Sequence, residues 1–222
     1  MFGLFKRGTG KGGVTPSLDA LGFDTTGYES QGEPLAGKLR VWHTPEGDGL
    51  GIYFFPMSPY LPTSVDSVDA LASFYRQMLG DSGGKLIEAK VVVAGLCPAT
   101  RTLISVPQQP SGRTCVGSIT VPFRDFSFVI KCQCVEGGPT GLKAALLLDR
   151  SLAVNELTIE GERFHIPGFD PDDPKHDAEF PNDPVARARR VLAHIIGSLV
   201  ISAEIRKLPG FALPQEAASS LE

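Results

Sequence analysis

The chain has 222 residues, with 21 Lys and Arg against 25 Asp and Glu, a formal net charge of −4. Its 42% hydrophobic and 21% charged residues are typical of a folded globular protein and exclude disorder over most of the length. The mild acidity excludes a nucleic-acid-binding protein driven by bulk positive charge. Glycine (25) and proline (18) supply 43 of the 222 residues, about 19% against about 12% on average, so we expect many turns between short elements.

The start of the chain, MFGLFKRGTGKGG, is not a secretory signal, because its apolar part is too short and precedes its basic residues. The most apolar later stretch, residues 191–203, is shorter than the roughly 20 residues that span a bilayer. We therefore expect a cytoplasmic protein without a membrane span. Its expected organisation is a flexible Gly-rich N-terminus (1–13), a single domain (14–212) and a disordered tail (213–222).

The first half of the chain predicts three strands and a helix. The strands are separated by Gly, Pro and Asp turns and cover residues 18–23, 38–43 and 49–55. In residues 67–79 apolar side chains recur at helical spacing, which predicts a helix with one stripe toward the core. Thr63 or Ser64 is its expected N-cap, and Gly80 its expected end.

Four strands follow, at hairpin-like spacing that predicts a largely antiparallel sheet: residues 85–94, 100–106, 115–121 and 126–135. The next helix is expected over residues 140–153, with inward side chains at Leu142, Ala145, Leu146 and Leu152. Residues 155–184 are Pro- and Asp-rich and predict a long loop with a Pro/Asp-rich surface.

The last predicted helix covers residues 184–197, with Asp183 as its N-cap and Pro184 at its first position. Its apolar stripe is formed by Val185, Ala188, Val191, Leu192, Ile195 and Ile196. A short strand over 199–205 is expected to end the domain. Runs of strands kept apart from helices predict an α+β fold in one domain.

The order of these elements resembles the Mog1/PsbP-like family over about residues 50–205. The matching segments are the helix VDSVDALASFYRQML, the strands RTLISV, CVGSITVPF and FSFVIKCQC, and the late helix VARARRVLAHIIGSLV. The resemblance implies an α/β/α sandwich in which helices cover both faces of an antiparallel sheet. It also implies binding rather than chemistry, since members include photosystem subunits, a Ran-binding import factor and bacterial chaperones for secreted effectors.

The four cysteines are Cys97, Cys115, Cys132 and Cys134, and none forms the C-x-x-C pair of a zinc or redox site. Reduced thiols in the core are the favoured interpretation. Residues 114–122 and 126–135 are expected to pair as a hairpin, which places Cys115 opposite either Cys132 or Cys134. A disulfide at that position stays open as the alternative.

Two glycine-rich strings imitate catalytic motifs. GDSGG at 80–84 spells the nucleophile motif of chymotrypsin-like proteases, but Ser82 comes too early in the chain and only His43 precedes it. A helix exit and turn is the favoured interpretation. GTGKGG at 8–13 has Gly12 where a phosphate-binding loop needs Ser or Thr, and no strand precedes it, so it is interpreted as a linker.

The acidic stretch 167–184 allows two interpretations. Its carboxylates are Asp170, Asp172, Asp173, Asp177, Glu179 and Asp183, with His165 and His176 nearby. Several carboxylates suit calcium or magnesium, but the EF-hand order is missing and five prolines fix turns here. A rigid surface loop is therefore favoured over a metal site, and this loop is the candidate partner surface.

Three arginines of the last helix, Arg187, Arg189 and Arg190, are interpreted as a solvated helix face, with a carboxylate or phosphate partner as the alternative. His194 falls on the same side as Arg187 and Arg190 and is expected to be structural. A pocket lined by Trp42 and Tyr53 is a further alternative to their packing in the core.

No complete catalytic constellation is present, so the sequence assigns no catalytic, cofactor-binding or metal-binding residue and predicts no cofactor. It predicts a non-enzymatic protein-binding or accessory protein, chaperone- or immunity-like, with a protein partner and no nucleic acid. The alternative is a small-molecule enzyme that uses a His or carboxylate general base in a pocket between sheet and helices. A small-molecule ligand therefore stays open.

Overall fold

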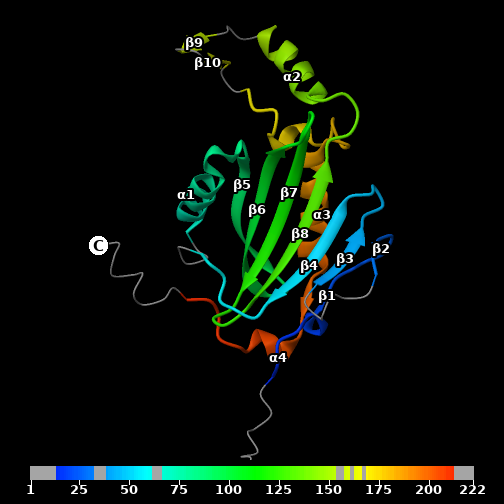
Figure 1. The fold of residues 1–222 in the computed structure, drawn as a ribbon, viewed down its shortest axis with the longest axis vertical. Coiled ribbons are helices and arrows are strands. Elements are labelled where there is room, and N and C mark those ends of the chain that lie inside the picture. Colours follow the sequence, from blue (N-terminus) through cyan, green and yellow to red (C-terminus); the bar gives the residue numbers. More distant parts are fainter. Residues whose placement is uncertain are drawn as a thin grey trace, which may run out of the picture.

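A seven-stranded antiparallel sheet forms the centre of the computed structural model, which describes residues 14–32, 39–61, 67–153, 158–160, 163–166 and 169–212 (Figure 1). Neighbouring strands follow the order β2-β3-β4-β8-β7-β6-β5. Their bounds are β2 Glu29–Ser30, β3 Leu39–His43, β4 Gly49–Phe55, β5 Lys85–Ala94, β6 Cys97–Pro107, β7 Arg113–Pro122 and β8 Ser127–Val135. The predicted α+β class and the predicted antiparallel pairing are confirmed. The Gly-rich string 8–13 and the expected caps Thr63 and Ser64 lie outside the described residues.

The helices take different positions around this sheet. Figure 1 shows α3 (Pro184–Ser198) behind the central strands, α1 (Val68–Leu79) beside edge strand β5, and α2 (Leu142–Leu152) beyond one end of the sheet. A short α4 (Ala203–Arg206) lies at the opposite end. Within the described part of the chain, no helix is both long and apolar enough to cross a membrane.

Three short predicted segments differ from the expectation. Residues 18–23 form a 3₁₀ turn (Leu18–Ala20) and β1 (Leu21–Gly22), because the Ser17 hydroxyl accepts from the Asp19 amide and starts a helical turn. The predicted strand 199–205 is β11 (Val200–Ile201) followed by α4, because Ser202 starts a helical turn in which the Arg206 amide donates to the Ser202 carbonyl at 3.1 Å. The predicted loop 155–184 also contains β9 (Thr158–Glu160), its partner β10 (Arg163–His165) and a 3₁₀ turn (Pro174–His176).

The main core lies between α3 and the strands β7 and β8. Leu192 and Ile195 of α3 are fully buried there, as the apolar stripe predicts. The close approach requires Gly117, because a Cβ at this position would lie 2.8 Å from both Cys132 Sγ and Leu192 Cδ1. Asp183 caps α3 as predicted, since its carboxylate accepts from the Val185 amide.

All four cysteines are buried and free. Cys115 lies directly opposite Cys134 in the β7–β8 register, so the predicted juxtaposition is confirmed and the disulfide alternative is wrong. Burial raises the pKa of Cys115 to about 12, which keeps this thiol protonated and unreactive at neutral pH.

Trp42 packs against the core, as favoured, and the alternative of a pocket shared by Trp42 and Tyr53 is wrong. Trp42 is the register partner of Leu50, and Tyr53 that of Leu39, so Trp42 and Tyr53 point to opposite faces of the sheet and share no pocket. On α1, Leu71 and Ala72 are buried as the apolar stripe predicts, whereas Met78 is exposed. The GDSGG string is a helix exit as predicted: Gly80 ends α1 and a 3₁₀ turn covers Gly80–Ser82.

Candidate functional site

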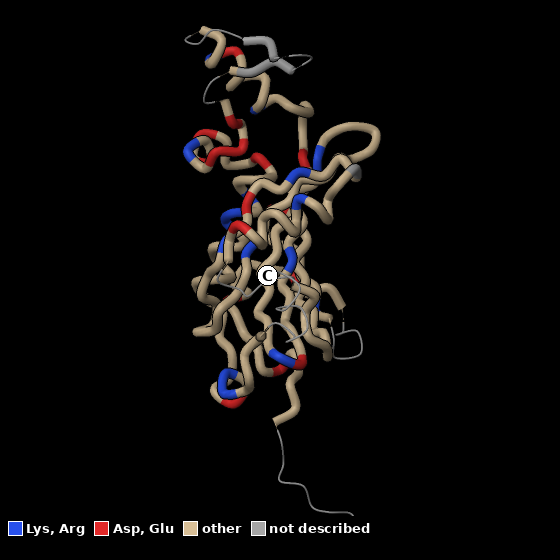
Figure 2. The backbone as a smooth tube through the Cα atoms, turned by 90° about the vertical axis from the view of Figure 1, so that its left-hand side faces the viewer, with Lys and Arg blue, Asp and Glu red and all other residues tan. Residues whose placement is uncertain are grey.

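The acidic segment, defined here as residues 169–183, is tied to the sheet by buried ion pairs. Arg113, at the start of β7, donates to Asp172 Oδ1 at 2.7 Å and to Asp183 Oδ2 at 3.1 Å. Lys85 Nζ of β5 donates to the other oxygen of Asp172 at 2.8 Å. Figure 2 shows several acidic positions gathered in the upper part of the molecule. The carboxylates that the sequence concentrates here therefore face cations of the protein itself.

Arginines of α3 form the second anchor of the acidic segment. Arg189 pairs with Glu88 of β5, donates to Asp177 Oδ1 at 2.8 Å, and donates to the Asp172 carbonyl at 2.6 Å. Arg187 binds both oxygens of Asp48, at 2.8 and 3.0 Å.

The prediction of a solvated arginine face is therefore wrong for two of the three arginines. The side chains of Arg187 and Arg189 are only 12% and 9% exposed, whereas that of Arg190 is 47% exposed. The buried positions are tolerated because Asp48 meets Arg187 in fork-like geometry, and the carboxylates of Glu88 and Asp177 each meet Arg189.

Ion pairing favours the charged forms of Asp172, Glu88 and Arg113. Burial alone would raise the pKa of Asp172, but hydrogen bonds from Lys85 and Arg113, together with their charges, hold that pKa below its usual range. Glu88 behaves in the same way, since Arg189 and Lys90 outweigh its burial and lower its pKa. Burial opposes the charge of Arg113, yet Asp172 and Asp183 raise its pKa above the ordinary value.

The metal interpretation of residues 167–184 gains no support from this arrangement. Asp172 and Asp183 are held by Arg and Lys side chains, and Asp173 by Lys175. Among the residues that the structure describes, no group of three or more His, Cys, Asp or Glu side chains is placed to hold a metal ion.

The helix α2 presents its leucines outward, which corrects the predicted orientation. Leu142, Leu146, Leu148 and Leu152 are 50%, 41%, 37% and 46% exposed. We name these four side chains the leucine face. The prediction that Leu142, Ala145, Leu146 and Leu152 point inward is wrong, because α2 approaches the rest of the protein with Lys143 and Leu147 instead.

A buried ion pair determines this orientation of α2. Lys143 Nζ lies 3.3 Å from Asp183 Oδ1, and both side chains are only 6% exposed. The ammonium group also lies 5.8 Å from the centre of the Phe180 ring. A second pair, Arg150 with Glu179 at 2.6 Å, joins the exposed side of α2 to the acidic segment. Satisfying Lys143 thus turns the leucines away from the body.

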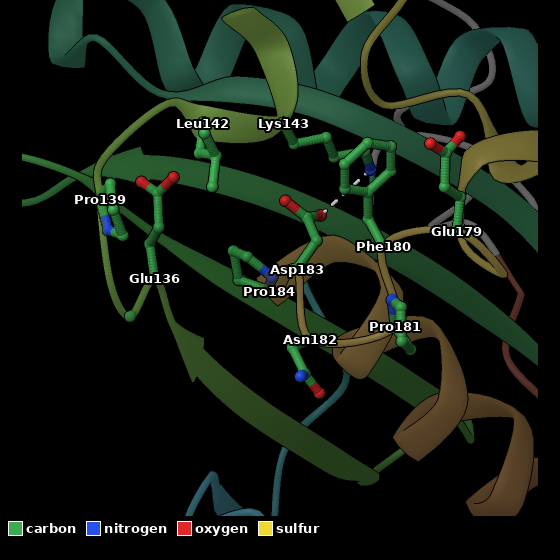
Figure 3. A pocket seen from close by; sticks show the side chains of 11 residues that line it. Glu136, Pro139, Leu142, Lys143, Glu179, Phe180, Pro181, Asn182, Asp183 and Pro184 are labelled. Atoms are coloured by element: carbon green, nitrogen blue, oxygen red, sulfur yellow. Dashed lines mark hydrogen bonds and ion pairs between the residues drawn. The ribbon is translucent and has the colours of Figure 1, made fainter. Parts of the chain in front are cut away.

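A pocket of about 270 Å³ lies beneath the first turn of α2, and Figure 3 shows it from close by. Lys143 and Asp183 face each other in its interior, with the Phe180 ring beside them. Its lining also includes the leucine-face residue Leu142. A second pocket of about 270 Å³ shares Lys143 and Asp183, so the ion pair stands between the two cavities.

Glu136 lines both pockets and is held in place by the backbone. One carboxylate oxygen accepts from the Arg113 amide at 3.0 Å, and the other accepts from the Gly141 amide at 3.0 Å. Gly141 adopts φ 73° at the start of α2, a left-handed conformation that suits glycine. Within the described residues no Lys or Arg pairs with Glu136, so its negative charge is not neutralised by the protein.

Among the side chains that the structure describes, no histidine lines these two pockets. His194 does lie with Arg187 and Arg190 as its helical spacing predicts, around a small pocket of about 140 Å³. Its Nε2 lies 2.7 Å from the Asp24 carbonyl oxygen, a contact that fixes the ring. His43 is exposed on β3.

Fold and site together define an α+β protein. One helix, α3, packs on the antiparallel sheet, and a leucine-rich helix, α2, lies beyond one end of the sheet with its leucines outward. No family model matches the chain, and no curated protein matches it. Among solved structures, the chain is similar to the Ran-binding protein Mog1p of Saccharomyces cerevisiae, with a TM-score of 0.44 and 8% identity over 82% of this chain and 90% of that one. A similarity of this degree concerns the fold alone.

Sequence reasoning found the acidic segment but missed the pocket residues Glu136, Lys143 and Phe180. One signal was present in the sequence: Lys143 is the single charged residue within the run Leu142–Leu148. A lysine inside an apolar run indicates a buried partner, because an unpaired charge is seldom fully buried.

Proposed function

We propose that this chain is a non-enzymatic accessory protein of the cytoplasm that binds another protein through the leucine face of α2. The observation that supports this proposal is the exposure of four leucines on one helix that has few contacts with other helices and strands. Contiguous exposed apolar surface is typical of protein-interaction sites. Residues 14–212 are the domain that carries this surface.

Covering the leucine face contributes favourable free energy to binding, about 4 kcal/mol in total. Burying a leucine completely contributes about 2 kcal/mol, so a leucine that is about half exposed contributes about 1 kcal/mol more when a partner covers it. The four side chains form two i, i+4 pairs, Leu142 with Leu146 and Leu148 with Leu152, on the outward side of α2, which a groove or helix of a partner can cover.

The alternative function, general-base catalysis on a small molecule, has less support. Asp183 is shared by Arg113 and Lys143, and Glu179 is paired with Arg150. Glu136 already accepts two backbone hydrogen bonds, which fix its orientation. Each carboxylate in the lining of the pocket beneath α2 therefore already accepts a hydrogen bond or forms an ion pair within the chain.

Site-specific crosslinking tests the proposal. A photoreactive amino acid replaces Leu146 in one variant and Met78, exposed on α1, in the control. We expect the Leu146 variant to crosslink one stoichiometric protein in native lysate, and the Met78 variant not to crosslink it.

A second pair of variants tests dependence on the leucines. The double change Leu142→Ser and Leu146→Ser should abolish capture of that protein, whereas Met78→Ser should retain it. Equal capture by both variants, repeated blank captures, or a product that contains only this chain would each contradict the proposal.

A further inference from the structure

We propose that the partner presents a basic amphipathic helix, and that the pocket beneath α2 receives one of its Lys or Arg side chains. This inference rests on the proposed function, because it identifies the chemistry of the partner that the leucine face binds. It is supported by the charge around α2, by the composition of the pocket, and by the position of the pocket next to the leucine face.

The charge is concentrated in one part of the chain. Residues 136–183 contain eleven Asp and Glu against four Lys and Arg, a net charge of −7. Since the whole chain has a net charge of −4, the remainder has a net charge of +3. Lys85, Arg113 and Arg189 come from other parts of the chain and pair with Asp172, Asp177 and Asp183. The negative charge that a partner meets at the leucine face is therefore smaller than −7, and Glu136 is its unpaired part among the described residues. An acidic partner or an anionic lipid surface would be repelled there.

The pocket itself suits a long basic side chain. Pro139, Leu142 and Phe180 give it apolar walls, and Figure 3 shows Glu136 at one side and Glu179 at the other. An Arg or Lys stem packs against apolar walls while its charged end reaches a carboxylate. Glu136 is the acceptor that the geometry favours, because its orientation is fixed by two backbone amides and no cation of the described chain pairs with it.

The interior ion pair makes the pocket selective for a cation. Lys143 and Asp183 neutralise one another, which leaves Glu136 and Glu179 as the remaining charges of the lining. Glu179 is paired with Arg150, which is exposed at the surface. A partner guanidinium can therefore bind without displacing a buried cation. An anionic group would lie between two carboxylates, which costs free energy.

Leu142 connects the pocket to the leucine face, since it lines the first and begins the second. A partner helix that lies along α2 thus places its basic side chain near Leu142 and its apolar side chains toward Leu152. Apolar residues at spacings of three and four, with a basic residue at one end, are the pattern that this surface selects.

Designed peptides serve as the probe. One helical peptide of about 18 residues carries leucines on one face and lysines on the other, and its matched control carries glutamates in place of lysines. Fluorescence anisotropy at low and high salt measures binding to the full chain. We expect the lysine peptide to bind at least tenfold more tightly than the glutamate peptide, with an affinity that falls as salt increases.

Single charge changes locate the binding site. Glu136→Gln and the surface change Glu179→Gln should each weaken the lysine peptide about three- to tenfold, which is typical of losing one charge-assisted contact. Asp69→Asn, which makes the same change in net charge on α1, should leave its affinity unchanged within about twofold. Thermal unfolding of each variant confirms that the fold is retained.

Two results would overturn the inference. One is equal binding of the two peptides, and the other is an equal response of the lysine peptide to Glu136→Gln, Glu179→Gln and Asp69→Asn. If the peptides give either of these results but capture of a protein from lysate still requires Leu142 and Leu146, the basic-partner inference fails and the proposed function stands. If capture is independent of the leucines, the proposed function itself fails.

Discussion

The helices α2 and α3 have similar amphipathic sequences and opposite surroundings. α3 buries eight of its fifteen residues, chiefly the apolar stripe that faces β7 and β8. α2 buries only Lys143 and Leu147 of its eleven residues and exposes four leucines. An apolar stripe thus shows that a helix needs a covering surface, but it does not show whether that surface belongs to the same chain.

The two helices also differ in what holds them. α3 is held by apolar contacts with the sheet, and its arginines add ion pairs at the edge of that contact. α2 is held chiefly by polar links to the acidic segment, the buried pair Lys143–Asp183 and the surface pair Arg150–Glu179. Apolar and polar attachment respond differently to mutation and pH, and the following predictions use that difference.

The largest effect is expected in the core beneath α3. Leu192→Ala removes a side chain that is 1% exposed and packs over Gly117, and should lower the free energy of unfolding by about 3 kcal/mol. Urea unfolding followed by circular dichroism measures this value. A loss below about 1 kcal/mol would show that α3 is not the main support of the sheet and would remove the contrast with α2.

A slightly smaller effect is expected where the acidic segment meets the sheet. Arg113→Leu leaves Asp172 and Asp183 buried with only Lys85 and Lys143 as partners, and should cost about 2–3 kcal/mol of unfolding free energy. The matched control is Arg124→Leu, which breaks the exposed pair with Asp125 and should cost less than about 0.5 kcal/mol. Equal costs in the same urea assay would contradict a structural role for the buried network.

The sequence predicted most of the fold because β4, β5 and α3 follow local rules. β4 and β5 have the residue bounds that alternation and turn residues indicate, and the Asp183-Pro184 start of α3 is a local capping signal. The candidate site depends on contacts between distant residues. Lys143 meets Asp183 forty positions later, and Arg113 meets Asp172 across 59 positions, and no local pattern encodes such pairs.

Acidification tests the polar attachment of the acidic segment. The pKa of Asp172 is lowered in the folded protein, so its stabilising contribution is present above the ordinary value near 4 and is lost as the pH falls through the lowered pKa. Wild type should therefore lose more stability than Asp172→Asn between pH 6 and pH 3, and the gap between their urea midpoints should narrow. Parallel midpoints over this range would show that Asp172 contributes nothing to the pH dependence.

The smallest effect is expected on the leucine face. Leu146→Ser changes a side chain that is 41% exposed and outside the core, so the free energy of unfolding should change by less than about 0.5 kcal/mol. Urea unfolding checks this value. The matched control is Leu147→Ser, which changes the next residue of the chain, a buried leucine, and should cost at least about 2 kcal/mol of unfolding free energy. A large loss for Leu146→Ser would mean that the chain itself covers this leucine. α2 would then be an ordinary packed helix like α3, and its leucines would not be available to a partner.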